Sequence, residues 1–349
     1  MNQRQLTKSY RGLTMLLLIV IGSADIVSAQ QLRSPEWIRQ RYGMRVHPSR
    51  DNSDMIRLVR PLSESVKASV VQVLSGTRPV ALGTVVSVDG HVLTKRSELT
   101  GDPVRVRLAD GQLLPARVAA VRRRHDLALL KVDTASDMTP IAFVDAPVSV
   151  SNFLISPGRG GRPIGIGVVG VSEVSVEHYG RLGVKLRSNQ EGRAQVREVV
   201  PGSGASQAGL QEGDLIVAIN GREEKTTTKV VETLGGMYSG ESVRLTIVRK
   251  GNRIEVDAGI RDMNVVLESE NDSKVNGPRS ERLSGFDRVI QHDTVLDPDE
   301  CGGPILNSSG QAIGLNIARA GRVVSYALPV SLVIPEMVSM LQEAREVAP

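Results

Sequence analysis

The sequence has little of several features that define common protein classes. Its 349 residues include one cysteine, Cys301, which excludes an intrachain disulfide. Aromatic residues make up only 3%, which argues against stacking platforms for nucleic-acid bases. Beyond the N-terminal region no run is long and apolar enough to span a bilayer. Metal-ligand spacings, phosphate loops and cofactor fingerprints are also missing from the sequence, so we expect no metal and no other cofactor.

The charge balance points away from nucleic acid as a partner. The formal net charge is only +5. Basic clusters are short, such as the run at 122–124, and runs of this length are typical of solvated turns. We therefore expect no nucleic-acid binding.

The first 29 residues have the pattern of a secretory signal peptide. Three basic residues precede an apolar stretch at 13–21, and small residues follow at 27–29. This pattern predicts cleavage after Ala29, whereas an uncleaved membrane anchor is the alternative interpretation. We expect an exported protein of the periplasm or cell envelope, with no transmembrane anchor after cleavage.

Short β-branched runs separated by glycine turns dominate residues 61–171. Two adjacent runs are joined by Asp89-Gly90 and two others by Asp110-Gly111, both strong hairpin signals. Strand patterns return over 288–328, and several short strands at this spacing predict an all-β barrel or sandwich. The apolar spacing over 331–346 predicts a terminal helix.

Three separated segments carry a specific pattern. They read Val-Leu-Thr-Lys-Arg-Ser-Glu-Leu at 92–99, Arg-His-Asp-Leu-Ala-Leu-Leu-Lys-Val at 124–132, and Asp-Pro-Asp-Glu-Cys-Gly-Gly-Pro-Ile-Leu-Asn at 297–307. In this order they resemble the segments that carry the catalytic His, Asp and Ser of HtrA/DegP-type exported proteases. The resemblance implies a mainly β fold, a trypsin-like double six-stranded β-barrel.

The resemblance also assigns the three catalytic positions. Ser97 stands where the family has its histidine base, Asp126 occupies the triad aspartate position, and Cys301 replaces the nucleophilic serine. A serine hydroxyl cannot accept a proton near pH 7, and loss of the base of a triad costs on the order of a million-fold in turnover. We therefore favour noncatalytic roles, with Asp126 as a buried hydrogen-bond acceptor and Cys301 as a small residue that fills the former serine position.

An active endopeptidase with Cys301 as nucleophile is the alternative, because a thiol ionises in part near neutral pH. The base would then be sought at His125 or His292, neither of which stands at the family's position. The oxyanion hole is altered as well, because the glycine that the family has two residues before the nucleophile is Asp299 here. Asp299 and Glu300 would both raise the thiol pKa and oppose an oxyanion.

Residues 172–262 carry a second specific pattern. The segments Val-Val-Pro-Gly-Ser-Gly-Ala at 199–205 and Ala-Gly-Leu-Gln-Glu-Gly-Asp-Leu-Ile-Val-Ala-Ile-Asn-Gly at 208–221 resemble a bacterial PDZ domain. A PDZ domain adds a peptide C-terminus as an extra strand. The resemblance implies that the backbone N–H groups of three residues hold the carboxylate, and that three residues of a helix at 228–237 face the groove or close the domain core. These are Leu182, Gly183 and Val184, and Val230, Val231 and Leu234.

The PDZ pattern interrupts the second barrel, because it lies between residue 171 and the segment of Cys301. The two ends of a PDZ domain lie close together, which makes such an insertion tolerable. We predict a signal peptide at 1–29, an N-terminal arm at 30–60, a first barrel at 61–138, a second barrel at 139–171 and 283–349, the PDZ domain at 172–262 and a polar linker at 263–282.

Three functions remain open from the sequence. We favour a catalytically impaired HtrA/DegP-like protein that binds peptides or unfolded C-termini in the envelope, as a quality-control adaptor. The rivals are the active endopeptidase and a purely structural envelope component. Family members often form trimers through an N-terminal segment; residues 30–60 match no such segment, which leaves a homo-oligomer open.

Overall fold

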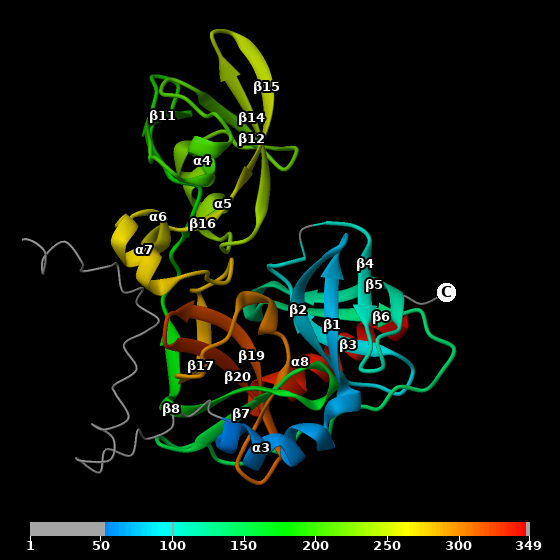
Figure 1. The fold of residues 1–349 in the computed structure, drawn as a ribbon. Coiled ribbons are helices and arrows are strands. Elements are labelled where there is room, and N and C mark those ends of the chain that lie inside the picture. Colours follow the sequence, from blue (N-terminus) through cyan, green and yellow to red (C-terminus); the bar gives the residue numbers. More distant parts are fainter. Residues whose placement is uncertain (1–52, 100, 347–349) are drawn as a thin grey trace, which may run out of the picture. The chain divides into compact units, whose positions relative to one another are not determined.

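The computed structural model describes residues 53–99 and 101–346 (Figure 1). The predicted signal peptide and most of the predicted N-terminal arm lie outside these residues. Helix α3 (Ser53–Ser65) begins the described chain, and its Val59 packs into an apolar cluster with Ile155 and Leu306. Within the described part of the chain, no helix has the length and apolar character that a membrane crossing requires.

Six strands of the N-terminal half close into a barrel. Both predicted Asp-Gly hairpins are confirmed, and Gly90 and Gly111 adopt φ values of +94° and +98°, which glycine reaches without a steric penalty. The strand order is β1-β2-β3-β6-β5-β4. The strands are β1 (Val70–Ser75), β2 (Arg78–Val85), β3 (His91–Lys95), β4 (Val104–Arg107), β5 (Leu113–Arg122) and β6 (Leu127–Val132).

A second closed barrel is built from two distant parts of the sequence, as Figure 1 shows by the green and orange strands that lie side by side. The order is β17-β20-β19-β18-β7-β8, which confirms the double-barrel fold. The strands are β7 (Phe153–Pro157), β8 (Pro163–Val176), β17 (Phe286–His292), β18 (Pro304–Leu306), β19 (Ala312–Gly321) and β20 (Val324–Pro329).

The terminal helix α8 (Val330–Glu346) joins the two barrels. Its Leu332, Val333 and Met340 are buried in one apolar cluster with Leu129 of β6 and Leu315 of β19. Burial of such side chains stabilises the fold by roughly 1.5–3 kcal/mol each. The helix therefore fixes the barrels to each other.

The inserted module has its own sheet, in the order β10-β11-β12-β14-β15. Its strands are β10 (Val184–Ser188), β11 (Ala194–Val199), β12 (Leu215–Ile219), β14 (Ser242–Arg249) and β15 (Asn252–Gly259), and helix α5 (Thr227–Gly235) contributes Val230 and Leu234 to the core. The chain enters through β9 (Gly180–Arg181) and leaves through β16 (Arg261–Asp262), which pair with each other. The ends of the insertion are thus held together by backbone hydrogen bonds.

Two short helices occupy the segment that we expected to be a polar linker. They are α6 (Met263–Val266) and α7 (Glu270–Asn276), and neither buries a residue. Asp262 accepts a hydrogen bond from the N–H of Asn264, and Ser269 accepts one from Asp272. These caps satisfy N–H groups that a helix start leaves free, which explains helices in a segment with little to bury.

The loop that carries Cys301 is joined to the first barrel by a close backbone contact. The N–H of Leu82 on β2 donates to the carbonyl of Cys301 at 2.8 Å. The next residue, Gly302, has φ +99°, and a Cβ there would lie 2.1 Å from the carbonyl oxygen of Leu82. Only glycine fits this position.

We predict that Gly302→Ala destabilises the protein far more than Gly111→Ala. Both glycines have φ near +98°, so both substitutions carry a similar backbone strain of about 1–2 kcal/mol. Only Gly302 would also bring a Cβ against backbone, whereas Gly111 has no atom within 4 Å of that position. Urea unfolding midpoints measure the difference, and equal midpoints for the two variants would contradict the contact between the barrels.

Candidate functional site

Ser97 and Asp126 form a closed hydrogen-bonded pair. The hydroxyl of Ser97 donates to Oδ2 of Asp126 at 2.7 Å, and its backbone N–H donates to Oδ1 at 2.9 Å. Asp126 is fully buried. Burial raises its pKa, while Arg282 and Lys95 oppose that shift. Ser97 therefore donates a hydrogen bond to each oxygen of the Asp126 carboxylate.

A turn of the inserted module packs directly on position 97. A Cβ at Gly240 would lie 2.9 Å from the Cβ of Ser97. The adjacent Glu241 holds this turn on the first barrel, with ion pairs of 2.6 Å to Arg96 and to Arg123. Burial alone would raise the pKa of Glu241, but the two guanidinium groups outweigh burial and hold it below its ordinary value.

Cys301 is sealed from solvent. Its side chain is fully buried, and its sulfur lies 3.8 Å from the carbonyl oxygen of Asp297. Burial raises the pKa of the thiol to about 11, although Lys95 and Ser280 oppose the shift. The thiolate, which is the nucleophilic form, is therefore strongly disfavoured at neutral pH.

Backbone donors around Cys301 are already used within its own loop. The 3₁₀ turn η4 (Pro298–Glu300) directs the N–H of Cys301 to the carbonyl of Pro298 at 3.3 Å, and the N–H of Glu300 to Asp297 at 2.9 Å. Asp299 lies inside this turn. An oxyanion hole needs N–H groups that point at the developing charge, and in this conformation these N–H groups do not.

Lys95 is a buried residue of the site that the sequence analysis missed. It lies on β3 with no exposed surface, and Nζ donates to Glu98 at 2.8 Å and to Ser280 at 2.9 Å. Burial alone would lower its pKa, but nearby negative groups, Glu98 first, outweigh burial and raise it. A charged ammonium cannot act as a base. The sequence signal that could have indicated a buried Lys95 was strand alternation, because Lys95 lies on the same strand face as the apolar Leu93.

The segment after α7 fills the space beside these residues. The hydroxyl of Ser280 also accepts a hydrogen bond from the N–H of Arg319 at 3.0 Å. Arg282 is fully buried and donates to the carbonyls of Arg123 and Arg124. Its guanidinium carbon lies 3.9 Å from the ring centre of Tyr238. The segment thus links the first barrel, the second barrel and the inserted module.

The two histidines considered as alternative bases, His125 and His292, contact groups other than Cys301. His125 lies between Asp287 and Glu336, with nitrogen–oxygen distances of 3.6 and 3.5 Å. His292 is buried with Nδ1 at 2.8 Å from the hydroxyl of Thr294, and burial lowers its pKa to about 4. No hydrogen bond joins either ring to Cys301 in the described part of the chain.

The inserted module contains an apolar groove of about 220 Å³. Gly183 has φ +87°, and a Cβ there would lie 2.1 Å from Cβ of Ser203, so the loop at 182–184 requires glycine. Val231 is 54% exposed on the groove, whereas Val230 is fully buried in the core of the module. The groove residues are Arg181, Leu182, Gly183, Val184, Leu186, Val200, Val231, Leu234, Gly235 and Met263.

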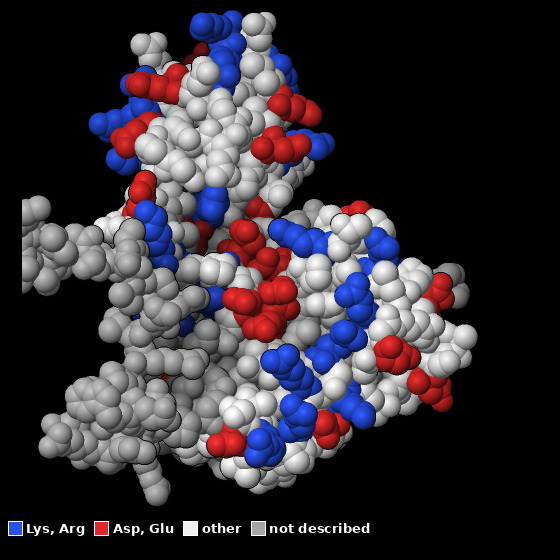
Figure 2. Space-filling model, in the orientation of Figure 1, with Lys and Arg blue, Asp and Glu red and all other residues white. Residues whose placement is uncertain are grey.

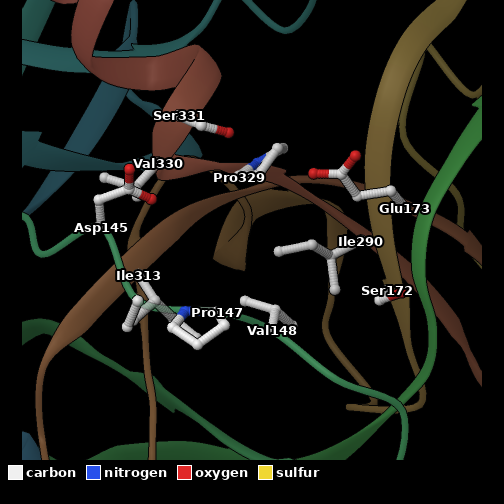
Figure 3. A pocket seen from close by; sticks show the side chains of 11 residues that line it. Asp145, Pro147, Val148, Ser172, Glu173, Ile290, Ile313, Pro329, Val330 and Ser331 are labelled. Atoms are coloured by element: carbon white, nitrogen blue, oxygen red, sulfur yellow. The ribbon is translucent and has the colours of Figure 1, made fainter.

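A second pocket, of about 290 Å³, lies on the second barrel, away from the triad positions. Figure 3 shows Asp145 and Glu173 at opposite sides of apolar residues that include Val148 and Ile290. Among the described residues, no group of three His, Cys, Asp or Glu side chains is placed to hold a metal ion.

Comparisons with known proteins agree with this architecture. The PDZ domain family model matches residues 180–260. A probable periplasmic serine endoprotease, DegP-like, of Hahella chejuensis is 26% identical over 259 residues, covering 50% of this chain and 55% of that protein. A DegP-like relative of Chlamydia trachomatis is 43% identical over 63 residues, 18% of this chain and 13% of that protein. The chain spans about half the length of the longer-matching curated relatives.

A solved structure, the MamO protease domain of Magnetospirillum magneticum in its apo form, is 18% identical, with a TM-score of 0.39. The structural match covers 78% of this chain and 96% of the MamO chain. The PDZ match, the DegP-like relatives and the two closed barrels come together in one chain. The chain is therefore similar to HtrA/DegP-type proteins, and its PDZ domain is inserted in the second barrel.

Proposed function

We propose that the protein is a catalytically impaired HtrA/DegP-type protein that captures peptides or unfolded C-termini through its PDZ groove, as a quality-control adaptor of the cell envelope. The observation that carries the proposal is the pair of hydrogen bonds from Ser97 to Asp126. A serine fills the place of the base and occupies the carboxylate that would orient it. Proteolysis needs that base.

Three further features support impairment over the endopeptidase alternative. With a thiol pKa of about 11, only about one molecule in ten thousand carries the thiolate at pH 7. Lys95 remains an ammonium group. The N–H of Cys301 is committed to Pro298. Relatives of this chain are named serine endoproteases, whereas this chain has Ser97 at the proposed position of the base and Cys301 at that of the nucleophile.

The proposed site of action rests on the relatives and on the N-terminal sequence. Several relatives are named periplasmic, and residues 1–29 have the signal-peptide pattern. We propose export to the periplasm, followed by cleavage after Ala29. The proposed domain plan is a first barrel at 61–138, a second barrel at 139–171 and 283–349, the PDZ domain at 172–262 and a linker at 263–282.

Incubation with unfolded casein tests the impairment directly. We expect neither the parent protein nor Cys301→Ala to release peptides above a buffer blank, even at micromolar protein and after hours, because both lack a base. A trypsin control verifies the assay. Cleavage by the parent alone would identify Cys301 as a working nucleophile and overturn the proposal.

The reactivity of the single thiol is a second test. Since Cys301 is the only cysteine, alkylation by iodoacetamide followed by intact mass reports on one site. We expect the folded protein at pH 8 to react at least about 100-fold more slowly than the guanidinium-unfolded chain, because the buried sulfur is protonated. Equal rates would indicate an accessible, activated thiol.

Substitution on the groove tests peptide capture. Val231 is exposed and lines the groove, so Val231→Asp should weaken binding of a fluorescent peptide with an apolar C-terminal residue by at least about tenfold without a loss of stability. Val323→Asp is a matched control, because Val323 is 56% exposed on the second barrel. Fluorescence anisotropy measures both, and amidation of the peptide C-terminus should abolish binding.

A further inference from the structure

Strand β10 offers a free edge beside the apolar groove, because it ends the sheet order β10-β11-β12-β14-β15. The inference that follows rests on the proposed capture of peptide C-termini. A carboxylate held by the loop at 182–184 places the end of the peptide beside the start of β10. The added strand therefore runs antiparallel to β10.

The alternation of β10 fixes which peptide residues meet which side chains. Val184 and Leu186 line the groove, whereas Lys185 and Arg187 are exposed and do not. Residues directly opposite each other in an antiparallel pair share one face of the sheet. With the last peptide residue opposite Val184, the residue before it lies opposite Lys185, and the residue three positions before the last lies opposite Arg187.

The two basic side chains on this face differ in whether a carboxylate already neutralises their charge. Nζ of Lys185 already lies 2.9 Å from Oε2 of Glu198 on β11. Nε of Arg187 instead donates to the neutral amide oxygen of Gln195 at 3.0 Å. In the described part of the chain no carboxylate forms an ion pair with Arg187, so its charge is free to meet a ligand.

The charge on the rest of the module does not mask this local difference. Figure 2 shows basic and acidic side chains interspersed over the module rather than a field of one sign. Several basic residues there are paired with acidic ones, such as Arg244 with Asp257 and Arg249 with Asp214. A preference for acidic peptides would therefore depend on position in the peptide rather than on its total charge.

We infer that the groove selects C-terminal segments that carry aspartate or glutamate three positions before the last residue, with Arg187 as the specificity-determining side chain. The apolar groove takes the last side chain, and the guanidinium pairs with the acidic one. A carboxylate one position before the last adds less affinity, because Glu198 already neutralises Lys185 and would repel the carboxylate of the peptide.

Three labelled peptides of eight residues test the inference on the purified full chain. The first peptide ends in Asp-Ser-Ala-Val, with aspartate three positions before the last residue. The second ends in Asn-Ser-Ala-Val. The third ends in Asn-Ser-Asp-Val, with aspartate only one position before the last. We expect the first to bind about two- to fivefold more tightly than the second, the range of an exposed ion pair. The third should show no such gain.

Arg187→Gln should remove the preference, while Arg253→Gln retains it, since Arg253 lies on β15 at the opposite edge of the sheet. High salt should narrow the difference between the first two peptides. If all peptides bind alike, or if Arg187→Gln keeps the preference, the inference is wrong and peptide capture stands. If no peptide binds, the proposed function itself fails and the inference fails with it.

Discussion

The pairing of β8 with β17 is the constraint on which the architecture depends. Register partners such as His292 and Val169 lie on either side of the inserted domain, so the second barrel closes only when both ends of that domain come together. The paired strands β9 and β16 achieve this at the entry and exit of the insertion. A folded insert with adjacent ends brings the barrel strands together at a smaller entropic cost than a flexible loop of equal length. For a flexible loop, the entropic cost of closure rises with its length.

The region around Ser97 and Asp126 is stabilised as a buried polar cluster. Lys95, Asp126 and Arg282 are all fully buried, and Glu98 is nearly so. Two cations and two anions in such a place are tolerated when each is paired or hydrogen-bonded, and here each has such a partner. Removal of one member would leave an uncompensated buried charge. This interdependence explains how Asp126 can stay buried with a serine, rather than a histidine, as its partner.

Local sequence signals were sufficient for much of the fold. The two Asp-Gly turns predicted hairpins because each needs only a glycine with positive φ between alternating strands. The loop around Gly183 was predicted for a similar reason, since its geometry depends on a few adjacent residues, and its role in carboxylate binding stays a prediction. Helical spacing alone could not tell which of Val230 and Val231 is buried. Adjacent residues of a helix point in different directions, and only the packing of the helix against the sheet decides which direction is buried.

The remaining features arise from contacts between distant residues. Lys95 meets Ser280, which is 185 positions away, and no spacing in the sequence indicates that pair. The packing of Gly240 on Ser97 likewise exists only once the inserted domain rests on the first barrel. Helices α6 and α7 were unexpected because their caps, rather than an apolar face, account for them. The assignments of Cys301, Asp126 and Ser97 to triad positions stay predictions of the family resemblance.

The burial of Cys301 has a consequence for biogenesis. In a compartment that oxidises thiols, a chain with one cysteine has no internal partner for a disulfide and is open to mixed disulfides or sulfenic acid while unfolded. Once the second barrel has closed over the sulfur, that chemistry is blocked. If the chain is exported as proposed, the hazard is limited to the time between translocation and closure, and folding speed rather than thiol chemistry would protect this residue.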